Sequence, residues 1–310
     1  MEEVARLEAA VKDYGSKRIG PISFSVGAGE IVGFLGPNGS GKSTTIRMLL
    51  GLIRPTSGLV RLMQMDPLAE HVKALSGVGY SPELPNLQSF LSPGELLRLT
   101  ARLLGLDGGT IQRQIPLLLE KAGLVEYQDY KITKLSKGMV QRLSVAQAMV
   151  GSPRLLILDE PMIGIDPAGV VHFRSIFREF VRDGGTIVMS SHILSEVESL
   201  CSSLAVIHSG RVVFRGGIQE FILKEVGARS IAIEVEKADE SLVRAVEAVK
   251  GVKRVSATGG GLVVEVSSDS DPRAEISRVV VESGAKLLSI GYARNELDEA
   301  YVNSMRGTAQ

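Results

Sequence analysis

The sequence predicts an α/β fold with a mostly parallel sheet and a helical insertion, followed by a smaller α+β domain. Three observations lead to this prediction. Short apolar runs alternate with helical patterns up to about residue 220, the segment from about 92 to 150 is helical throughout, and the pattern resets after Gly227. The 310 residues are enough for two unequal domains, each with its own core. We place the boundary near residues 222–229, which gives domains at 1–225 and 229–310.

Four apolar runs predict the main strands of the first domain. Each is nearly continuous rather than alternating, which is typical of parallel strands buried on both faces. The runs are GEIVGFLG (29–36), RLLILDE (154–160), GTIVMSS (185–191) and LAVIH (204–208). Between the first two, LSPGELLRLTARLLGL and IQRQIPLLLEKAGL carry apolar residues at helical spacing, so we expect the helical insertion there.

The second domain is predicted to be ferredoxin-like. IAIEVE (231–236) alternates as a strand and SLVRAVEAVK (241–250) is helical. RVSAT and LVVEVSS then flank a GGG turn, AEISRVVVESG is helical, and KLLSIGY ends as a strand. This βαββαβ order is that of the ferredoxin-like arrangement.

Composition excludes several classes of protein. Lysine plus arginine equals aspartate plus glutamate at 35 each, so no nucleic-acid partner is expected. The single cysteine, Cys201, rules out an internal disulfide and fits a reducing compartment. The N-terminus, MEEVARLEAA, lacks the basic-then-apolar order of a signal peptide, and no apolar run is long enough to cross a bilayer. We therefore expect a soluble protein.

GPNGSGKSTT (36–45) fits the G-x-x-x-x-G-K-[ST] phosphate-loop pattern, between a predicted strand and a predicted helix. The glycines allow a tight turn whose N–H groups point at phosphate oxygens, and the helix that follows adds its dipole. Lys42 is expected to reach the β- and γ-phosphates, and the Ser43 hydroxyl to ligate Mg²⁺. The expected nucleotide contacts in this loop are Gly36, Pro37, Asn38, Gly39, Ser40, Gly41, Lys42, Ser43 and Thr44.

RLLILDEP predicts the second half of a nucleotide site. An apolar strand that ends in two carboxylates brings Asp159 to the carboxyl edge of the sheet, where open α/β sheets bind ligands. Asp159 is expected to hold the Mg²⁺ water shell. Glu160 follows directly and can orient or deprotonate the attacking water, which favours hydrolysis over binding alone.

The order of the motifs resembles that of the ATP-binding subunit of an ABC transporter, over residues 1 to about 220. GPNGSGKST, a loop position at Glu83, LSKGM, LLILDEP, GIDP and SSH follow one another as in that family. The resemblance implies a P-loop NTPase core that hydrolyses ATP with Mg²⁺.

LSKGM resembles the signature of this family and comprises Leu135, Ser136, Lys137, Gly138 and Met139. In the family two subunits pack head to tail, and the signature of one closes over the ATP held by the other. Ser136 would thus donate to the γ-phosphate of the partner's ATP, with the Gly138 N–H and the helix dipole beside it. By itself, the motif would read only as a helix that begins with Ser136 as its N-cap.

The resemblance implies three further roles. Tyr14 in KDYGSKR would stack on adenine, although a lone tyrosine there also fits simple packing. Asp166 in GIDP would be the central acid of the loop that couples the two sites. His192 in SSHILSEVE would contact the γ-phosphate and hold the attacking water with Glu160. Glu160, His192 and Lys42 are therefore the expected catalytic residues.

The sequence departs from the family pattern in three places, one of which is Met162 and Ile163, which are more apolar than usual after Pro161. Glu83 stands where the family commonly has glutamine, and its charge favours metal contact, so we expect it at the metal with Ser43 and Asp159. Lys137 and Met139 replace the more usual glycine and glutamine of the signature. We hypothesise that Lys137 offsets the charge of Glu83 across the dimer.

The glutamate variant and the added domain are similar to the ATPases of ABC-2 type exporters, many of which end in a short helix like NELDEAYVNSM. This implies separate transmembrane permease subunits, a peripheral position on the cytoplasmic face of the membrane, and a homodimer or a heterodimer with a related ATPase. The substrate is not implied. A soluble ABC ATPase that acts on ribosomes, nucleic acid or protein assembly is the alternative. The C-terminal domain is either a small-molecule sensor or a dimerising or packing module.

Overall fold

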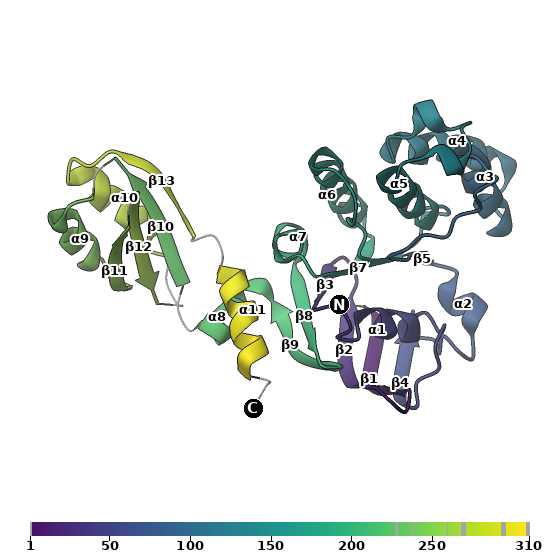
Figure 1. Ribbon diagram of the computed structural model, residues 1–310, viewed down its shortest axis with the longest axis horizontal. Coiled ribbons are helices and arrows are strands. Elements are labelled where there is room, and N and C mark those ends of the chain that lie inside the picture. Colours follow the sequence, from purple (N-terminus) through teal and green to yellow (C-terminus); the bar gives the residue numbers. More distant parts are fainter. Residues whose placement is uncertain are drawn as a thin grey trace. The chain divides into compact units, whose positions relative to one another are not determined.

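The computed structural model describes residues 2–226, 229–236, 238–258, 260–267, 271–292 and 296–307. The chain divides into two compact units, Met1–Arg215 and Gly216–Gln310 (Figure 1). This division lies ahead of the predicted boundary near 222–229, of which residues 227 and 228 lie outside the described part, as does residue 259 of the GGG turn.

The first unit is built on a six-stranded sheet in the order β5-β6-β7-β3-β8-β9. The neighbours from β5 to β8 pair in parallel, and the predicted strands lie at the centre as expected. The strands are β3 (Ile31–Leu35), β5 (Val78–Ser81), β6 (Leu155–Asp159), β7 (Thr186–Ser191), β8 (Ser203–His208) and β9 (Arg211–Gly217). The helices that accompany them are α1 (Lys42–Leu49), α2 (His71–Leu75), α6 (Pro167–Arg182) and α7 (Leu194–Leu200).

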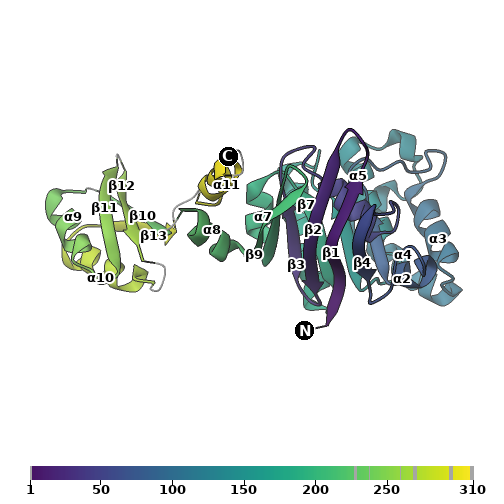
Figure 2. The same ribbon diagram turned by 90° about the horizontal axis from the view of Figure 1, so that it is seen from below.

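A second, antiparallel sheet in the same unit has the order β2-β1-β4 and was not predicted. Its strands are β1 (Glu3–Asp13), β2 (Arg18–Gly27) and β4 (Ser57–Leu62), of which β1 and β2 stand in front in Figure 2. Register shifts after Leu7 and after Ala10 break the period-two pattern of β1, which hides it from a sequence search. Phe24 of β2 meets Phe34 of β3 at 4.8 Å between ring centroids. Ile46 and Leu49 of α1 belong to the same buried core, so both sheets hold α1 in place.

The predicted helical insertion is present, with capped helix starts. Its elements are α3 (Pro93–Leu103), α4 (Gly108–Lys121), the 3₁₀ turns η1 (Val125–Tyr127) and η2 (Ile132–Lys134), and α5 (Lys137–Ala148). Ser92 and Glu95 form a capping box at the start of α3, and Asp107 caps α4. Within the described residues, no helix has the length and apolarity that crossing a membrane requires.

The second unit has the predicted βαββαβ order, with its antiparallel sheet ordered β11-β12-β10-β13. The elements are α8 (Ile218–Val226), β10 (Arg229–Val235), α9 (Glu240–Glu247), β11 (Val252–Thr258), β12 (Gly261–Val266), α10 (Arg273–Glu282), β13 (Leu287–Tyr292) and α11 (Glu296–Gly307). Helices α9 and α10 cover one face of the sheet (Figures 1 and 2). The terminal helix α11 packs on α8, where Asn303 donates to the Glu225 carbonyl at 3.1 Å. This helix pair moves the division of the chain ahead of α8.

Candidate nucleotide-binding site

The loop between β3 and α1 has the strand–loop–helix context that the sequence predicted. Gly39 and Gly41 take positive φ angles of 79° and 115°, which favour glycine. A Cβ on Gly36 would lie 2.2 Å from the Ile207 carbonyl oxygen and 2.7 Å from Ser40 Oγ. Lack of space therefore excludes a side chain at Gly36, and the backbone conformation disfavours one at Gly39 and Gly41. Helix α1 begins at the end of this loop with Lys42.

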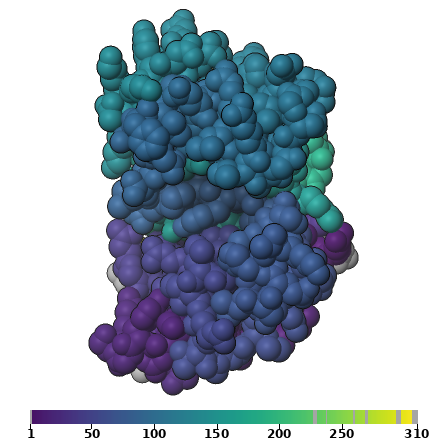
Figure 3. Space-filling view, turned by 90° about the vertical axis from the view of Figure 1, so that its right-hand side faces the viewer, coloured from purple at the N-terminus to yellow at the C-terminus, as the bar shows by residue number. Residues whose placement is uncertain are grey.

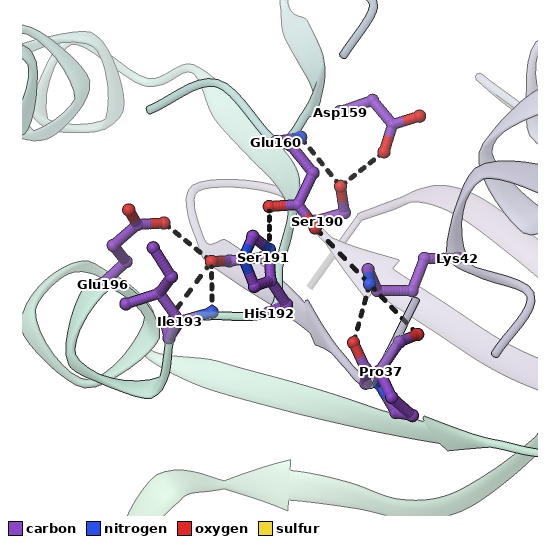
Figure 4. A network of polar contacts seen from close by, with 10 residues as sticks. Pro37, Lys42, Asp159, Glu160, Ser190, Ser191, His192, Ile193 and Glu196 are labelled. Carbon is purple, nitrogen blue, oxygen red and sulfur yellow. Dashed lines mark hydrogen bonds and ion pairs between the residues drawn. The ribbon is translucent and has the colours of Figure 1, made fainter. Parts of the chain in front are cut away.

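Lys42 lies buried inside the loop, with 5% of its surface exposed. Its Nζ donates to the Gly36 carbonyl at 2.6 Å and lies 3.4 Å from Glu160 Oε1 (Figure 4). Ser40 Oγ and Glu160 Oε1 are buried with no hydrogen-bond partner among the described residues. A buried ammonium beside an unpartnered hydroxyl and the N-terminus of a helix is suited to the oxygens of a phosphate chain.

A cavity of about 310 Å³ opens at this loop. It is lined by Tyr14, Lys17, Ile19, Pro37, Asn38, Gly39, Gly41, Lys42, Ser43, Thr44, Glu83 and Glu160. The expected adenine partner, Tyr14, lies at its edge with 49% of its surface exposed, and Lys12 Nζ stands 5.5 Å from its ring centroid. Lys17 and Ile19 were not predicted. Lys17 Nζ donates to the Gly39 carbonyl at 2.5 Å and thus adds a cation close to the phosphate loop. Lys17 belongs to no sequence motif, so the sequence did not predict it.

The end of β6 meets the end of β7 at the carboxylate pair. Ser190 Oγ donates to Asp159 Oδ1 at 2.5 Å and accepts from the Glu160 backbone N–H at 2.9 Å (Figure 4). Glu160 has a φ angle of 49°, a left-handed conformation that strains a residue with a side chain. His192 Nδ1 lies 2.8 Å from Glu160 Oε2. The structure thus brings together Lys42, Glu160 and His192, the three residues predicted to be catalytic.

Asp159 and Glu83 both act on Tyr80 of β5. Burial raises the pKa of the Tyr80 hydroxyl, and the negative charges of Asp159 and Glu83 raise it further, while Arg47 opposes them. Asp159 is the last residue of β6, and Glu83 and Ser43 line the cavity. In the described part of the chain no three His, Cys, Asp or Glu side chains cluster as a metal site would require. Mg²⁺ commonly uses one or two carboxylates together with nucleotide phosphates, and these donors fit that pattern.

A second hydrogen-bonded group lies behind His192 and was not predicted. Ser191 Oγ donates to Glu196 Oε2 of α7 at 2.7 Å and accepts from the Ile193 backbone N–H at 2.9 Å (Figure 4). No sequence pattern indicates that the Glu196 carboxylate of α7 points inward to Ser191 at the end of β7.

The signature residues lie outside the cavity of their own chain. Ser136 caps α5 and accepts from the Met139 backbone N–H at 3.2 Å. A Cβ on Gly138 would lie 2.9 Å from the Gly164 carbonyl oxygen, so α5 begins against the GIDP loop. The stem of Lys137 also lies over Gly164. Asp166 caps α6 by accepting from the Gly169 N–H at 3.3 Å.

Comparisons with known proteins agree with this geometry. Residues 19–163 match the family model described as ABC transporter. A bacitracin transport ATP-binding protein of Bacillus licheniformis is 31% identical over 309 residues, 99% of both chains. A Nod factor export ATP-binding protein of Ralstonia nicotianae is 36% identical over 231 residues, 74% of this chain and 72% of the relative.

Among solved structures, an ATP-binding subunit of an ABC transporter superimposes with a TM-score of 0.68 at 31% identity. The match covers 72% of this chain and 93% of that one. The sequence comparisons and the structural comparison thus point to the same family. On this combined ground, the chain belongs to the ATP-binding, ATP-hydrolysing proteins of ABC transporters.

Proposed function

We propose that this protein binds MgATP between two head-to-tail subunits and uses its hydrolysis to drive export through separate membrane-spanning proteins. The observation that carries the proposal is the continuous polar chain from Lys42 through Glu160 to His192 at the end of the phosphate loop. Phosphoryl transfer depends mostly on positioning and on the stabilisation of charge, and such a chain supplies both.

Each residue of the chain has a distinct task. Lys42 stabilises charge on the β- and γ-phosphates, to which it is pre-oriented by the Gly36 carbonyl. Glu160 orients or deprotonates the attacking water, and His192 fixes the Glu160 carboxylate. Mg²⁺, when bound, neutralises phosphate charge, and Ser43, Asp159 and Glu83 are the residues that would hold it. Tyr14 stacks on the adenine at the cavity edge.

The dimer is proposed because the signature residues of one chain lie outside the nucleotide cavity of that chain. Ser136 and Lys137 are exposed and lie outside the cavity. Two copies related head to tail would bring them over the partner's phosphate loop, and Asp166 would lie at the contact between the sites. Since Lys42, Glu160, His192 and Ser136 are all present in this chain, two identical copies would make two complete sites.

Exposed apolar side chains support a membrane partner near the Glu83 loop. Four large apolar side chains in this region have between 70% and 82% of their surfaces exposed. They are Val72 of α2, Leu84 and Phe90 of the loop after β5, and Leu103 of α3. Figure 3 shows a face of the molecule with the helical insertion at the top and earlier residues of the chain below it. The loop 82–92 connects these two parts in the sequence. Large apolar side chains exposed to this degree fit a protein–protein contact. A permease docked there would hold the chain at the cytoplasmic face of the membrane.

Export follows from the relatives, whose names give Nod factor export and bacitracin transport. The membrane partner selects the substrate, so the sequence of this chain does not identify it.

A tagged Glu160→Gln variant, isolated with ATP from detergent-solubilised native membranes, tests the proposal. Mass spectrometry of the co-purifying polypeptides is the measurement, and a Lys42→Ala variant that cannot retain ATP is the matched control. A partner with several apolar spans, enriched over that control, would support the transporter. Recovery of ribosomal or other soluble partners, with the bait absent from the membrane fraction, would favour the soluble ABC ATPase.

A further inference from the structure

Two consecutive serines at the end of β7 support the two halves of the hydrolytic site. Ser190 holds Asp159 and the backbone of Glu160. Ser191 faces the other way and holds the turn that carries His192, because its Oγ accepts from the Ile193 backbone N–H at 2.9 Å. The orientation of the Ser191 hydroxyl is therefore linked to the turn that carries His192.

Glu196 fixes that orientation. Its Oε2 accepts from Ser191 Oγ at 2.7 Å, and the residue is 7% exposed. By contrast, the His192 side chain is 40% exposed, and its ring contacts the Glu160 carboxylate at 2.8 Å. A buried acceptor behind an exposed ring can support the ring through the backbone turn between them.

The surroundings of Glu196 include charge of both signs from several elements. Glu160 after β6 and Cys201 after α7 are acidic or ionisable, whereas His192 in the turn and Arg174 of α6 are basic. Burial is the main cause that raises the pKa of Glu196, and the Ser191 hydrogen bond opposes it. The carboxyl is thus held by Ser191 in both protonation states, since each retains an oxygen that can accept.

We propose that Glu196 is a positioning residue for ATP hydrolysis, which acts through Ser191 to aim His192 at Glu160. The inference rests on the roles proposed above for Glu160 and His192. It assigns to α7 the task of holding the turn, although no residue of α7 touches the cavity. Loss of the acceptor would leave the turn free to rotate His192 away from its 2.8 Å contact with Glu160.

The test compares ATP turnover in four variants of the full-length protein. Glu196→Leu removes the acceptor, Ser191→Ala removes the donor, and Glu196→Gln restores an acceptor at the same reach. Glu198→Leu, on the exposed face of α7, is the matched control. We expect kcat to fall about tenfold or more in the first two, as a small misplacement near a reacting group does. The KM for ATP should stay within about twofold because the phosphate loop is untouched, and Glu196→Gln should recover most of the kcat.

A double-mutant cycle with His192→Ala separates positioning from general destabilisation. If Glu196 acts through His192, Glu196→Leu has no further effect on turnover in the His192→Ala background. If the losses of kcat in Glu196→Leu and His192→Ala multiply in the double variant, the inference is overturned. It is also overturned if His192→Ala hydrolyses ATP slowly while Ser191→Ala and Glu196→Leu hydrolyse it at the wild-type rate. Unchanged turnover of His192→Ala itself would overturn the proposed site and the inference with it. Should Glu196→Leu fail to fold, the Ser191→Ala cycle decides the matter, because it removes only a hydroxyl.

Discussion

Glu160 uses both carboxylate oxygens, one toward Lys42 and one toward His192. Because the residue is 6% exposed, water cannot replace either contact without opening the site. A change of charge at this position therefore affects both Lys42 and His192.

Replacing Glu160 by glutamine should separate binding from hydrolysis. The amide keeps the size of the side chain but cannot accept a proton, so we expect ATP hydrolysis to fall about a hundredfold or more while ATP binding persists. Phosphate release and the fluorescence of a bound nucleotide analogue measure the two properties, with Glu198→Gln as control. Turnover near that of the wild type would remove Glu160 from its proposed role.

Glu83 and Lys137 provide a test of the head-to-tail dimer. Glu83 lines the cavity of its own chain, whereas Lys137 does not. If Lys137 faces the partner's Glu83 loop, Glu83→Gln should cost less activity when Lys137→Gly is also present. We expect a coupling of about threefold or more in kcat across the four proteins. Rates that simply multiply would exclude contact between the two charges.

The raised pKa of Glu196 makes a prediction about stability and pH. A raised native pKa means that the folded protein binds this proton more tightly than the unfolded chain, whose carboxyl titrates near 4.5. The stabilisation is complete below that pH and is lost as pH rises through the native pKa. Glu196→Gln lacks this dependence, so the variant should gain thermal stability relative to wild type as pH rises above 4.5. A Tm difference between Glu196→Gln and wild type that stays constant as pH rises would contradict it.

At the scale of elements, the start of α5 and the loop before α6 form one packed contact. Gly138 meets the Gly164 carbonyl, and Ser136 and Asp166 cap the two helices that leave from this place. The signature and the GIDP loop of one chain should therefore move together.

A methyl group at the first turn of α5 tests that contact. In Gly138→Ala the Cβ would lie 2.9 Å from a backbone oxygen, which cannot turn aside as a side chain would. We expect a loss of about 1–3 kcal/mol in the free energy of unfolding together with slower ATP turnover. Gly108→Ala, at the first turn of α4, is the control because its Cβ would meet nothing within 4 Å. Equal stability of the two variants in urea would contradict the packing.

The sequence predicted those elements whose pattern is local. The phosphate loop, the central strands and the βαββαβ unit each carry a continuous signal in the chain, and all are present. The sheet β2-β1-β4 was missed because the bulges of β1 interrupt its alternation. Ser190, Ser191 and Glu196 were missed for a different reason. Their partners are fixed by which strand ends meet in space, and a hydroxyl's hydrogen bond leaves no periodicity in the sequence.

For the whole molecule, the pairing of α8 with α11 determines where the chain can be divided. Ile218, Phe221 and Ile222 of α8 are buried in the same unit as Leu297 and Ala300 of α11. A cut after residue 227 would keep α8 but remove the helix that covers it.

We therefore expect different behaviour from two truncations. A chain that ends at Gly217 keeps β9 and should remain monodisperse and hydrolyse ATP, since its core belongs to the first unit. A chain that ends at residue 227 exposes the apolar face of α8 and should self-associate. Light scattering and phosphate release measure both, with the full-length protein as reference. Two truncations with the same scattering would show that α8 does not need α11.

The left-handed backbone of Glu160 means that the fold is strained at the residue proposed to activate the attacking water. Glycine adopts a φ of 49° without the strain that a Cβ introduces there. A chain selected for thermostability alone would drift toward glycine or asparagine at position 160 and lose its carboxylate. A laboratory search for heat-resistant variants, run without a screen for turnover, should thus enrich inactive proteins at this residue.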